Sequence, residues 1–138
     1  MVYFESWNAF LKQLEEQTGI QVYDMRTPSK GVNIPYIVCG RNQINSFYAD
    51  NKIWYSQCIV DVLLFSYSPS DGKENPQPVW MEDTFIAEDK VSSYFRDRRI
   101  NYTTDYSWMM EEQLLQTHYS IAITYGEENE EEVKKDNG

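Results

Sequence analysis

The chain has 138 residues and a formal net charge of −10, a length that favours one domain with its own hydrophobic core. Its aromatic fraction of 15% is not typical of a disordered chain, and its negative charge argues against tight binding to nucleic acid phosphates. The sequence contains no run of about 18 apolar residues that would predict a membrane span, and its start, MVYFESWNAF, lacks the pattern of an export signal.

Residues 3–18 predict an amphipathic helix. Apolar side chains recur at the helical spacing i, i+3, i+4, i+7, which predicts one core-packing face made of Trp7, Phe10, Leu11 and Leu14. Gly19 follows, and glycine is the residue that most often ends a helix. Residues 20–26 then alternate as a short strand, which the segment Pro-Ser-Lys-Gly at 28–31 interrupts.

Two strand candidates follow, separated by a polar segment. Residues 36–40, YIVCG, form a β-branched run that predicts a strand. Residues 41–51 are too polar for a buried element and predict a loop, with a turn at 49–52. Residues 53–67, IWYSQCIVDVLLFSY, predict the longest strand, and neither of its alternating faces is polar throughout. We therefore expect its second face to be covered, in part by this chain and in part by a neighbouring subunit.

The C-terminal half predicts a connection, a helix and two strands. Residues 68–80 carry three prolines and a glycine and predict an exposed connection. Residues 82–99 predict a helix, and residues 100–106 and 114–125 predict strands. This order predicts an α+β fold, with a small, mostly antiparallel sheet and two main helices packed on one face.

Composition divides the chain into two parts. Residues 1–126 are expected to form the single α+β domain. Residues 127–138 carry six acidic side chains and two lysines, which predicts a disordered acidic tail. This tail is either a solubilising end or a segment that becomes ordered on a partner.

The sequence contains little that predicts chemistry. The single histidine, His118, lies on the more polar face of the last strand and has no zinc-ligand spacing with the two cysteines. Cys39 and Cys58 lie in apolar strands, which predicts reduced core residues rather than a disulfide or a nucleophile beside His118. No glycine-rich phosphate loop leads from a strand into a helix. We expect no catalytic residue, no metal, no cofactor and no enzymatic activity.

Arg96, Arg98 and Arg99 form the most concentrated positive patch of the sequence. Basic residues are typical of a helix C-terminus, where they interact favourably with the last carbonyl groups. The alternative reading is a contact for an acidic partner surface.

Three segments together resemble the tail terminator, or tail completion, proteins of bacteriophages with long non-contractile tails. They are IPYIVCG at 34–40, SFYADNKIWY at 46–55 and DYSWMMEEQLLQTHYSIAIT at 105–124. The resemblance covers residues 1–125, and FYADNK is its most specific part. The proline-containing connection at 68–79 is longer than in the family, Cys39 replaces a larger residue, and the tail after Gly126 is not part of the family pattern. These departures leave open a partner specific to this virus.

The resemblance implies an α+β fold and a structural role in the virion. Such proteins form a ring, usually a hexamer, that caps the tail tube, ends its growth and joins the tail to the neck of the head. The implied partners are further copies of this chain, the major tail tube protein and a head-closure protein, and viral DNA passes through the ring without specific binding. The implied location is the head–tail interface of the virion, after synthesis in the host bacterial cytoplasm, with no membrane contact.

Such a ring requires contacts between two different patches of each subunit. We expect residues 55–67 to supply one patch and residues 41–51 the other, with the arginine patch as a further contact. The expected contact residues are Asn45, Phe47, Tyr48, Asp50, Tyr55, Ile59, Leu63, Phe65, Arg96, Arg98 and Arg99.

Two alternatives remain at this point. The first is another neck protein of the virion, such as a head-closure ring, which would carry a β-barrel with little helix. The second is a monomeric, host-directed binding module, which would not be part of the virus particle.

Overall fold

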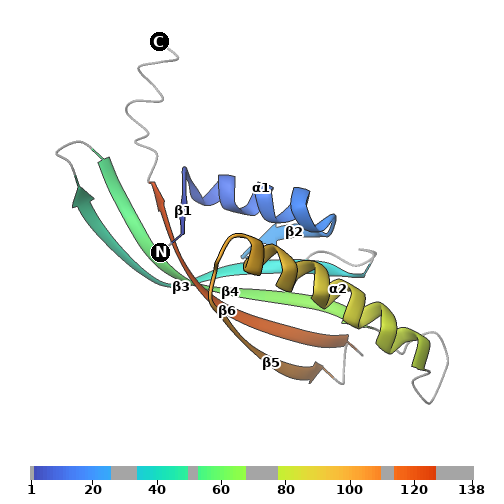
Figure 1. The fold of residues 1–138 in the computed structure, drawn as a ribbon. Coiled ribbons are helices and arrows are strands. Elements are labelled where there is room, and N and C mark those ends of the chain that lie inside the picture. The colour runs from blue at the N-terminus through green and yellow to red at the C-terminus, as the bar shows by residue number, and fades with distance from the viewer. Residues whose placement is uncertain (1, 26–33, 50–52, 68–77, 110–113, 127–138) are drawn as a thin grey trace, which may run out of the picture.

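The computed structural model describes residues 2–25, 34–49, 53–67, 78–109 and 114–126 (Figure 1). Six strands and two helices lie within these ranges. In chain order they are β1 (Tyr3–Phe4), α1 (Trp7–Thr18), β2 (Gln21–Asp24), β3 (Tyr36–Ala49), β4 (Ile53–Tyr67), α2 (Pro78–Asp97), β5 (Tyr102–Met109) and β6 (Leu114–Gly126).

Helix α1 has the boundaries that its capping residues dictate. The Ser6 side chain accepts a hydrogen bond from the Ala9 N–H at 3.0 Å and so caps the start of the helix. Gly19 ends the helix with a left-handed φ of 70°, as predicted. The expected helical start at residue 3 is wrong, because Tyr3 and Phe4 pair with β6 as a short strand.

The sheet is mixed. Its strands follow the order β1-β6-β4-β3-β2, and β5 also pairs with β6. The β3–β4, β4–β6 and β5–β6 ladders are antiparallel, whereas the short β1–β6 and β2–β3 ladders are parallel. Helix α1 follows β1 and precedes β2 in the chain, and it therefore connects the two ends of this strand order.

The expected small, mostly antiparallel sheet with two main helices on one face is wrong. The protein is mostly β, and its mixed sheet is curled into half a barrel, with two helices among the described residues. Strands β3, β4 and β6 have 14, 15 and 13 residues, and strands of this length accumulate a large right-handed twist. The helices therefore lie within the curve of a large sheet (Figure 1).

The predicted loop at 41–51 is wrong for most of its length. Strand β3 continues to Ala49, which pairs with Ile53, so β3 and β4 form one long antiparallel hairpin. Backbone pairing, rather than burial of side chains, holds this polar part of β3 in the sheet, because its side chains from Asn42 to Phe47 are exposed. The turn expected at 49–52 falls largely on residues 50–52, which lie outside the described residues.

The remaining boundaries differ modestly from the predictions. Helix α2 begins at Pro78, a residue type favoured in the first helical turn, so the expected connection at 68–80 is wrong for residues 78–80. Residues 68–77 and the expected disordered tail at 127–138 lie outside the described residues. Strands β4 and β6 match their predicted ranges within one residue.

The main hydrophobic core lies between the inner face of the curled sheet and both helices. Phe10 and Leu14 from α1 and Phe95 from α2 are fully buried in it, together with Val60 and other residues of β4. The Phe95 ring packs edge-on against Tyr119 of β6, with ring centroids 5.5 Å apart. The core stripe predicted for α1 is confirmed, with Leu11 packed at its margin.

Candidate functional site

The two faces of the β3–β4 hairpin have different environments. The even-numbered side chains of β4 from Ser56 to Ser66 are buried on the inner face, so the odd-numbered side chains lie on the opposite face, called here the outer face. The register shift between Arg41 and Gln43 pairs Phe47 with Tyr55 and Asn45 with Gln57. Six of the expected contact residues therefore share the outer face: Asn45, Phe47, Tyr55, Ile59, Leu63 and Phe65.

One end of the outer face exposes apolar side chains. The Phe47 and Tyr55 rings stack with centroids 5.8 Å apart, and Tyr3 packs edge-on against Tyr55 at 5.6 Å. Tyr3 is 48% exposed, Phe47 38% and Ile59 40%. Tyr3, Phe47, Tyr55 and Ile59 are called here the apolar patch. The Tyr55 ring contacts both other rings, and Ile59 lies further along the same face of β4, after Gln57. Exposed apolar side chains gathered on one face are typical of an interaction surface.

The other end of the outer face is buried within the chain. Tyr36, Val38 and Phe65 form a second small hydrophobic cluster, and Tyr23 and Leu63 pack against it. The rings of Tyr36 and Phe65 stack with centroids 4.9 Å apart. Phe65 therefore contributes to internal packing, and only 6% of its surface is accessible to a partner.

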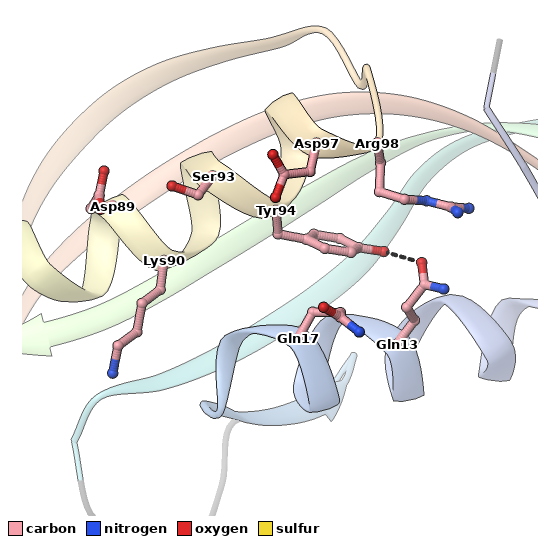
Figure 2. A pocket seen from close by; sticks show the side chains of 8 residues that line it. All are labelled: Gln13, Gln17, Asp89, Lys90, Ser93, Tyr94, Asp97 and Arg98. Atoms are coloured by element: carbon pink, nitrogen blue, oxygen red, sulfur yellow. Dashed lines mark hydrogen bonds between the residues drawn. The ribbon is translucent and has the colours of Figure 1, made fainter.

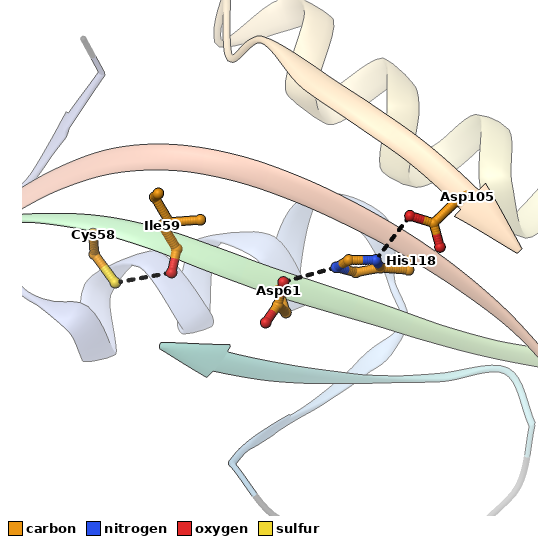
Figure 3. A network of polar contacts seen from close by, with 5 residues as sticks. All are labelled: Cys58, Ile59, Asp61, Asp105 and His118. Atoms are coloured by element: carbon orange, nitrogen blue, oxygen red, sulfur yellow. Dashed lines mark hydrogen bonds and ion pairs between the residues drawn. The ribbon is translucent and has the colours of Figure 1, made fainter. Parts of the chain in front are cut away.

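A network of polar contacts crosses three strands between these two ends (Figure 3). His118 of β6 lies between two carboxylates, with its Nε2 atom 2.7 Å from Asp61 Oδ1 of β4 and its Nδ1 atom 3.1 Å from Asp105 Oδ2 of β5. The register places Asp105 directly opposite His118, and Asp61 beside it on the next strand. Only the protonated imidazolium donates from both ring nitrogens, so this geometry favours the charged form.

The pKa of His118 responds to two opposing influences. Burial lowers the pKa, whereas the hydrogen bonds to Asp61 and Asp105 and the negative charges of both carboxylates raise it. The second influence is larger, so the pKa of His118 lies above its ordinary value of 6.5. The network thus favours the protonated form of His118.

The structure separates the cysteines from the histidine. Cys39 and Cys58 are both free and buried, as predicted, and they lie on the inner face, whereas His118 lies on the outer face. Burial raises the pKa of the Cys39 thiol far above its ordinary value and that of Cys58 to about 11. The Cys58 thiol is directed to the backbone carbonyl of Ile59 at 3.4 Å (Figure 3). These thiols are poor nucleophiles, because the thiolate is the reactive form.

Three arginines lie at the C-terminal end of α2, and their surroundings differ. They are Arg96 in the last helical turn and Arg98 and Arg99 just after it. The guanidinium of Arg98 lies over the ring of Phe4 at 4.8 Å, and its Nε atom is buried. Arg96 is exposed and makes an exposed ion pair with Asp89 at 3.5 Å. Arg99 is exposed and follows the helix in a left-handed conformation with φ 57°. Arg98 thus belongs to the packing of the fold, and Arg96 and Arg99 remain accessible.

The positions of two expected contact side chains, those of Tyr48 and Asp50, are not described. Asp50 lies outside the described residues. For Tyr48 only the backbone is described, which pairs with Trp54 across the hairpin.

A polar pocket lies between the two helices (Figure 2). Its volume is about 450 Å³, and its lining includes Gln13, Gln17, Lys90, Tyr94 and Asp97. The Tyr94 hydroxyl donates to Gln13 Oε1 at 2.8 Å and so links α2 to α1, and burial raises the pKa of Tyr94 to about 12. The lining mixes both charges with amides and shows no pairing of a nucleophile with a base.

The sequence did not indicate Tyr3, Asp61 or Asp105 as surface residues of interest. Tyr3 was assigned to a helix, and the parallel β1–β6 pairing that brings it to Tyr55 spans almost the whole chain. The alternation of β4 and β5 assigns Asp61 and Asp105 to a face, but only the strand register shows that both reach His118. A register between distant strands is not encoded in a local pattern.

Within the described ranges, no group of three or more His, Cys, Asp or Glu side chains is arranged to hold a metal ion. Neither helix α1 nor the described part of α2 is long and apolar enough to cross a membrane. Models of known protein families and the curated proteins gave no match to this chain.

Proposed function

We propose that this protein is a structural component of a bacteriophage virion that forms a ring, of six subunits by resemblance, on the end of the tail tube. The ring ends tube growth and joins the tail to the head. Its partners are copies of the same chain, the major tail tube protein and a head-closure protein. Its place in the virion is the head–tail interface, and viral DNA passes through the ring.

The apolar patch is the observation that carries this proposal. The segment SFYADNKIWY, which carries the most specific part of the resemblance, contributes Phe47 and Tyr55, and their stacked rings lie on the outer face rather than in the core. With Tyr3 and Ile59 they present apolar surface to solvent. A protein that works as a ring subunit requires such a surface, because each copy must bury part of itself against its neighbours.

Charge also supports the proposal. A chain with a net charge of −10 does not retain DNA through its phosphates, because such retention requires lysine and arginine to replace counterions. A ring through which DNA passes benefits from weak binding. This argument applies to any neck protein and does not select among them.

A head-closure ring is the second candidate, and one observation favours it. The sheet is curled into half a barrel and the protein is mostly β, which is closer to the barrel architecture of such rings than the expected small sheet. The two candidates differ in what they control. A tail terminator sets tail length, whereas a head-closure protein acts on the head.

Electron microscopy of a virus with an early stop codon in this gene tests the proposal. We expect DNA-filled heads beside separate tails of irregular or excessive length in negatively stained lysates. Separate tails of normal length would support the head-closure candidate instead. Complete, infectious particles would contradict both and would favour a host-directed binding module. Supplying the wild-type gene from a plasmid controls for effects of the stop codon on neighbouring genes.

A further inference from the structure

A ring made of identical subunits requires two different patches on each subunit, since each copy contacts its neighbours head-to-tail. The two patches expected from the sequence, in residues 41–51 and 55–67, fall on the same outer face. These two patches therefore form only one of the two surfaces that meet between neighbouring subunits. The other surface has to lie elsewhere on the molecule.

The C-terminal end of α2 lies on the opposite side of the sheet from the outer face (Figure 1). Arg96 and Arg99 are exposed there, beside a shallow pocket that Ile100, Asn101 and Tyr102 complete. These two arginines, called here the basic end, are close in sequence. Arg96 lies in the last turn of α2, and Arg99 is the second residue after the helix.

Arg99 occupies an unusual backbone position. The Arg99 N–H donates to the Arg96 carbonyl at 3.0 Å and the Ile100 N–H to the Phe95 carbonyl at 2.8 Å, so Arg99 follows the end of the helix with φ 57°. Glycine, or sometimes asparagine, is the usual residue at such a position. A side chain larger than asparagine is strained there, and strained positions are often retained for function.

Charge restricts how two copies can meet. Each copy has a net charge of −10, so copies repel one another unless positive groups of one lie opposite negative groups of the next. The outer face carries the carboxylates of Asp61 and Asp105, whose side chains are 31% and 69% exposed. One oxygen of each carboxylate contacts His118, and an arginine of the next copy would add a second positive group to the same two carboxylates. Arginine is well suited to this contact, because its guanidinium binds carboxylates with two parallel hydrogen bonds.

We propose that Arg96 and Arg99 of one copy bind Asp61 and Asp105 on the outer face of the next copy. The apolar patch adjoins this contact and supplies buried area. The inference rests on the proposed ring and names the contact between its neighbouring subunits. Arg98 does not take part, because its guanidinium lies over Phe4. Arg96 exchanges its exposed ion pair with Asp89 for this contact.

Charge reversal tests the contact in the virus. In cells infected by the stop-codon virus, Arg99→Asp or Asp105→Arg supplied from a plasmid is expected to lower the yield of infectious particles at least about tenfold. The combined variant is expected to restore most of the yield, because the pair is again complementary. Equal yields from the wild type and both single variants, or no restoration by the combination, would overturn the contact.

Arg99→Gly separates binding from folding. Glycine relieves the backbone strain at position 99, so we expect a higher melting temperature than in the wild type. The same variant is expected to give a lower yield of particles, because one partner of the contact is lost. A more stable Arg99→Gly variant that supports normal particle yield would contradict the proposal.

Cross-linking tests the contact independently of virus assembly. A chain with Arg99→Cys and Asp105→Cys is oxidised, both as concentrated purified protein and in lysates that contain tails, while the native cysteines are buried. We expect a ladder of covalently linked chains from the double variant, and at most dimers from each single variant. No ladder in either sample would overturn the contact. If the stop-codon virus is complete but the ladder forms, the tail role fails and the contact stands.

Discussion

At the scale of single residues, the charge of His118 depends on pH and on two neighbouring carboxylates. Its two ring nitrogens lie within hydrogen-bonding distance of Asp61 and Asp105, and each carboxylate belongs to a different neighbouring strand. The proton on His118 therefore connects β4, β6 and β5 on the outer face. When that proton is lost, one of the two hydrogen bonds is lost and the carboxylates are no longer balanced by a positive charge.

Stability is expected to fall as pH rises through the pKa of His118 in the folded protein. That pKa is raised above 6.5, so the folded state binds the proton more tightly than the unfolded state. The stabilisation is present in full below the unfolded pKa and is lost as pH rises through the folded pKa. Urea unfolding at about pH 5.5 and about pH 8.5 measures it.

His118→Gln is the matched control, because the chain contains no other histidine. Its free energy of unfolding is expected to change less than that of the wild type between the two pH values. An equal change in both proteins would show that other groups cause the pH dependence.

At the scale of elements, the docking of β1 depends on a close approach at Gly126. A Cβ atom at this position would lie 2.8 Å from the backbone carbonyl oxygen of Glu5 and 3.0 Å from the Tyr3 hydroxyl. A backbone atom cannot move aside easily, so a side chain here would displace the N-terminal segment from β6. The parallel β1–β6 pairing thus requires glycine at the end of β6.

Gly126→Ala is expected to lower the free energy of unfolding by about 1–3 kcal/mol, the usual cost of an overpacked site. Gly40→Ala is the matched control, because its added Cβ would meet only the Met25 sulfur at an ordinary 3.6 Å. Urea unfolding of both variants measures the difference. Equal stabilities of the two variants would contradict a tight contact at Gly126.

The elements that the sequence predicted are those with a local pattern. The α1 stripe ending at Gly19 and the alternation of β4 and β6 appear within a few residues, and the structure confirms them. The second half of β3 was missed because its residues are polar and its place in the sheet comes from pairing with β4. The curl, the parallel edges and the shared outer face were missed because they follow from strand length, crossover and register, which link distant residues.

At the scale of the whole molecule, the two faces of the curled sheet differ in burial. Its inner face and the helices form the main core, and part of its outer face remains exposed. Substitutions on the two faces should therefore have different consequences. Substitutions on the inner face are expected to lower stability, and under the proposed function substitutions in the apolar patch are expected to impair assembly of folded chains.

The effects of the two sides on stability and on assembly are compared by making the same substitution on each, Phe10→Ala in the main core against the inner face and Phe47→Ala on the outer face. Phe10 is fully buried, so its loss is expected to cost about 3–5 kcal/mol of unfolding free energy. Phe47 is 38% exposed, so its loss is expected to cost less than about 1 kcal/mol. Phe47→Ala is nevertheless expected to fail to restore the stop-codon virus. If Phe47→Ala unfolds the protein but the folded fraction still assembles, Phe47 is a core residue.

The central position of β6 also determines when the chain is able to fold. Strands β1, β4 and β5 all pair with β6, and Tyr3 pairs with Thr124 across nearly the full sequence. A nascent chain that still lacks residues 114–126 has the N-terminal strand and the long hairpin without the strand that joins them. Contacts between such distant residues slow folding and leave strand edges open to aggregation. Completion of this sheet therefore waits until synthesis has passed Gly126.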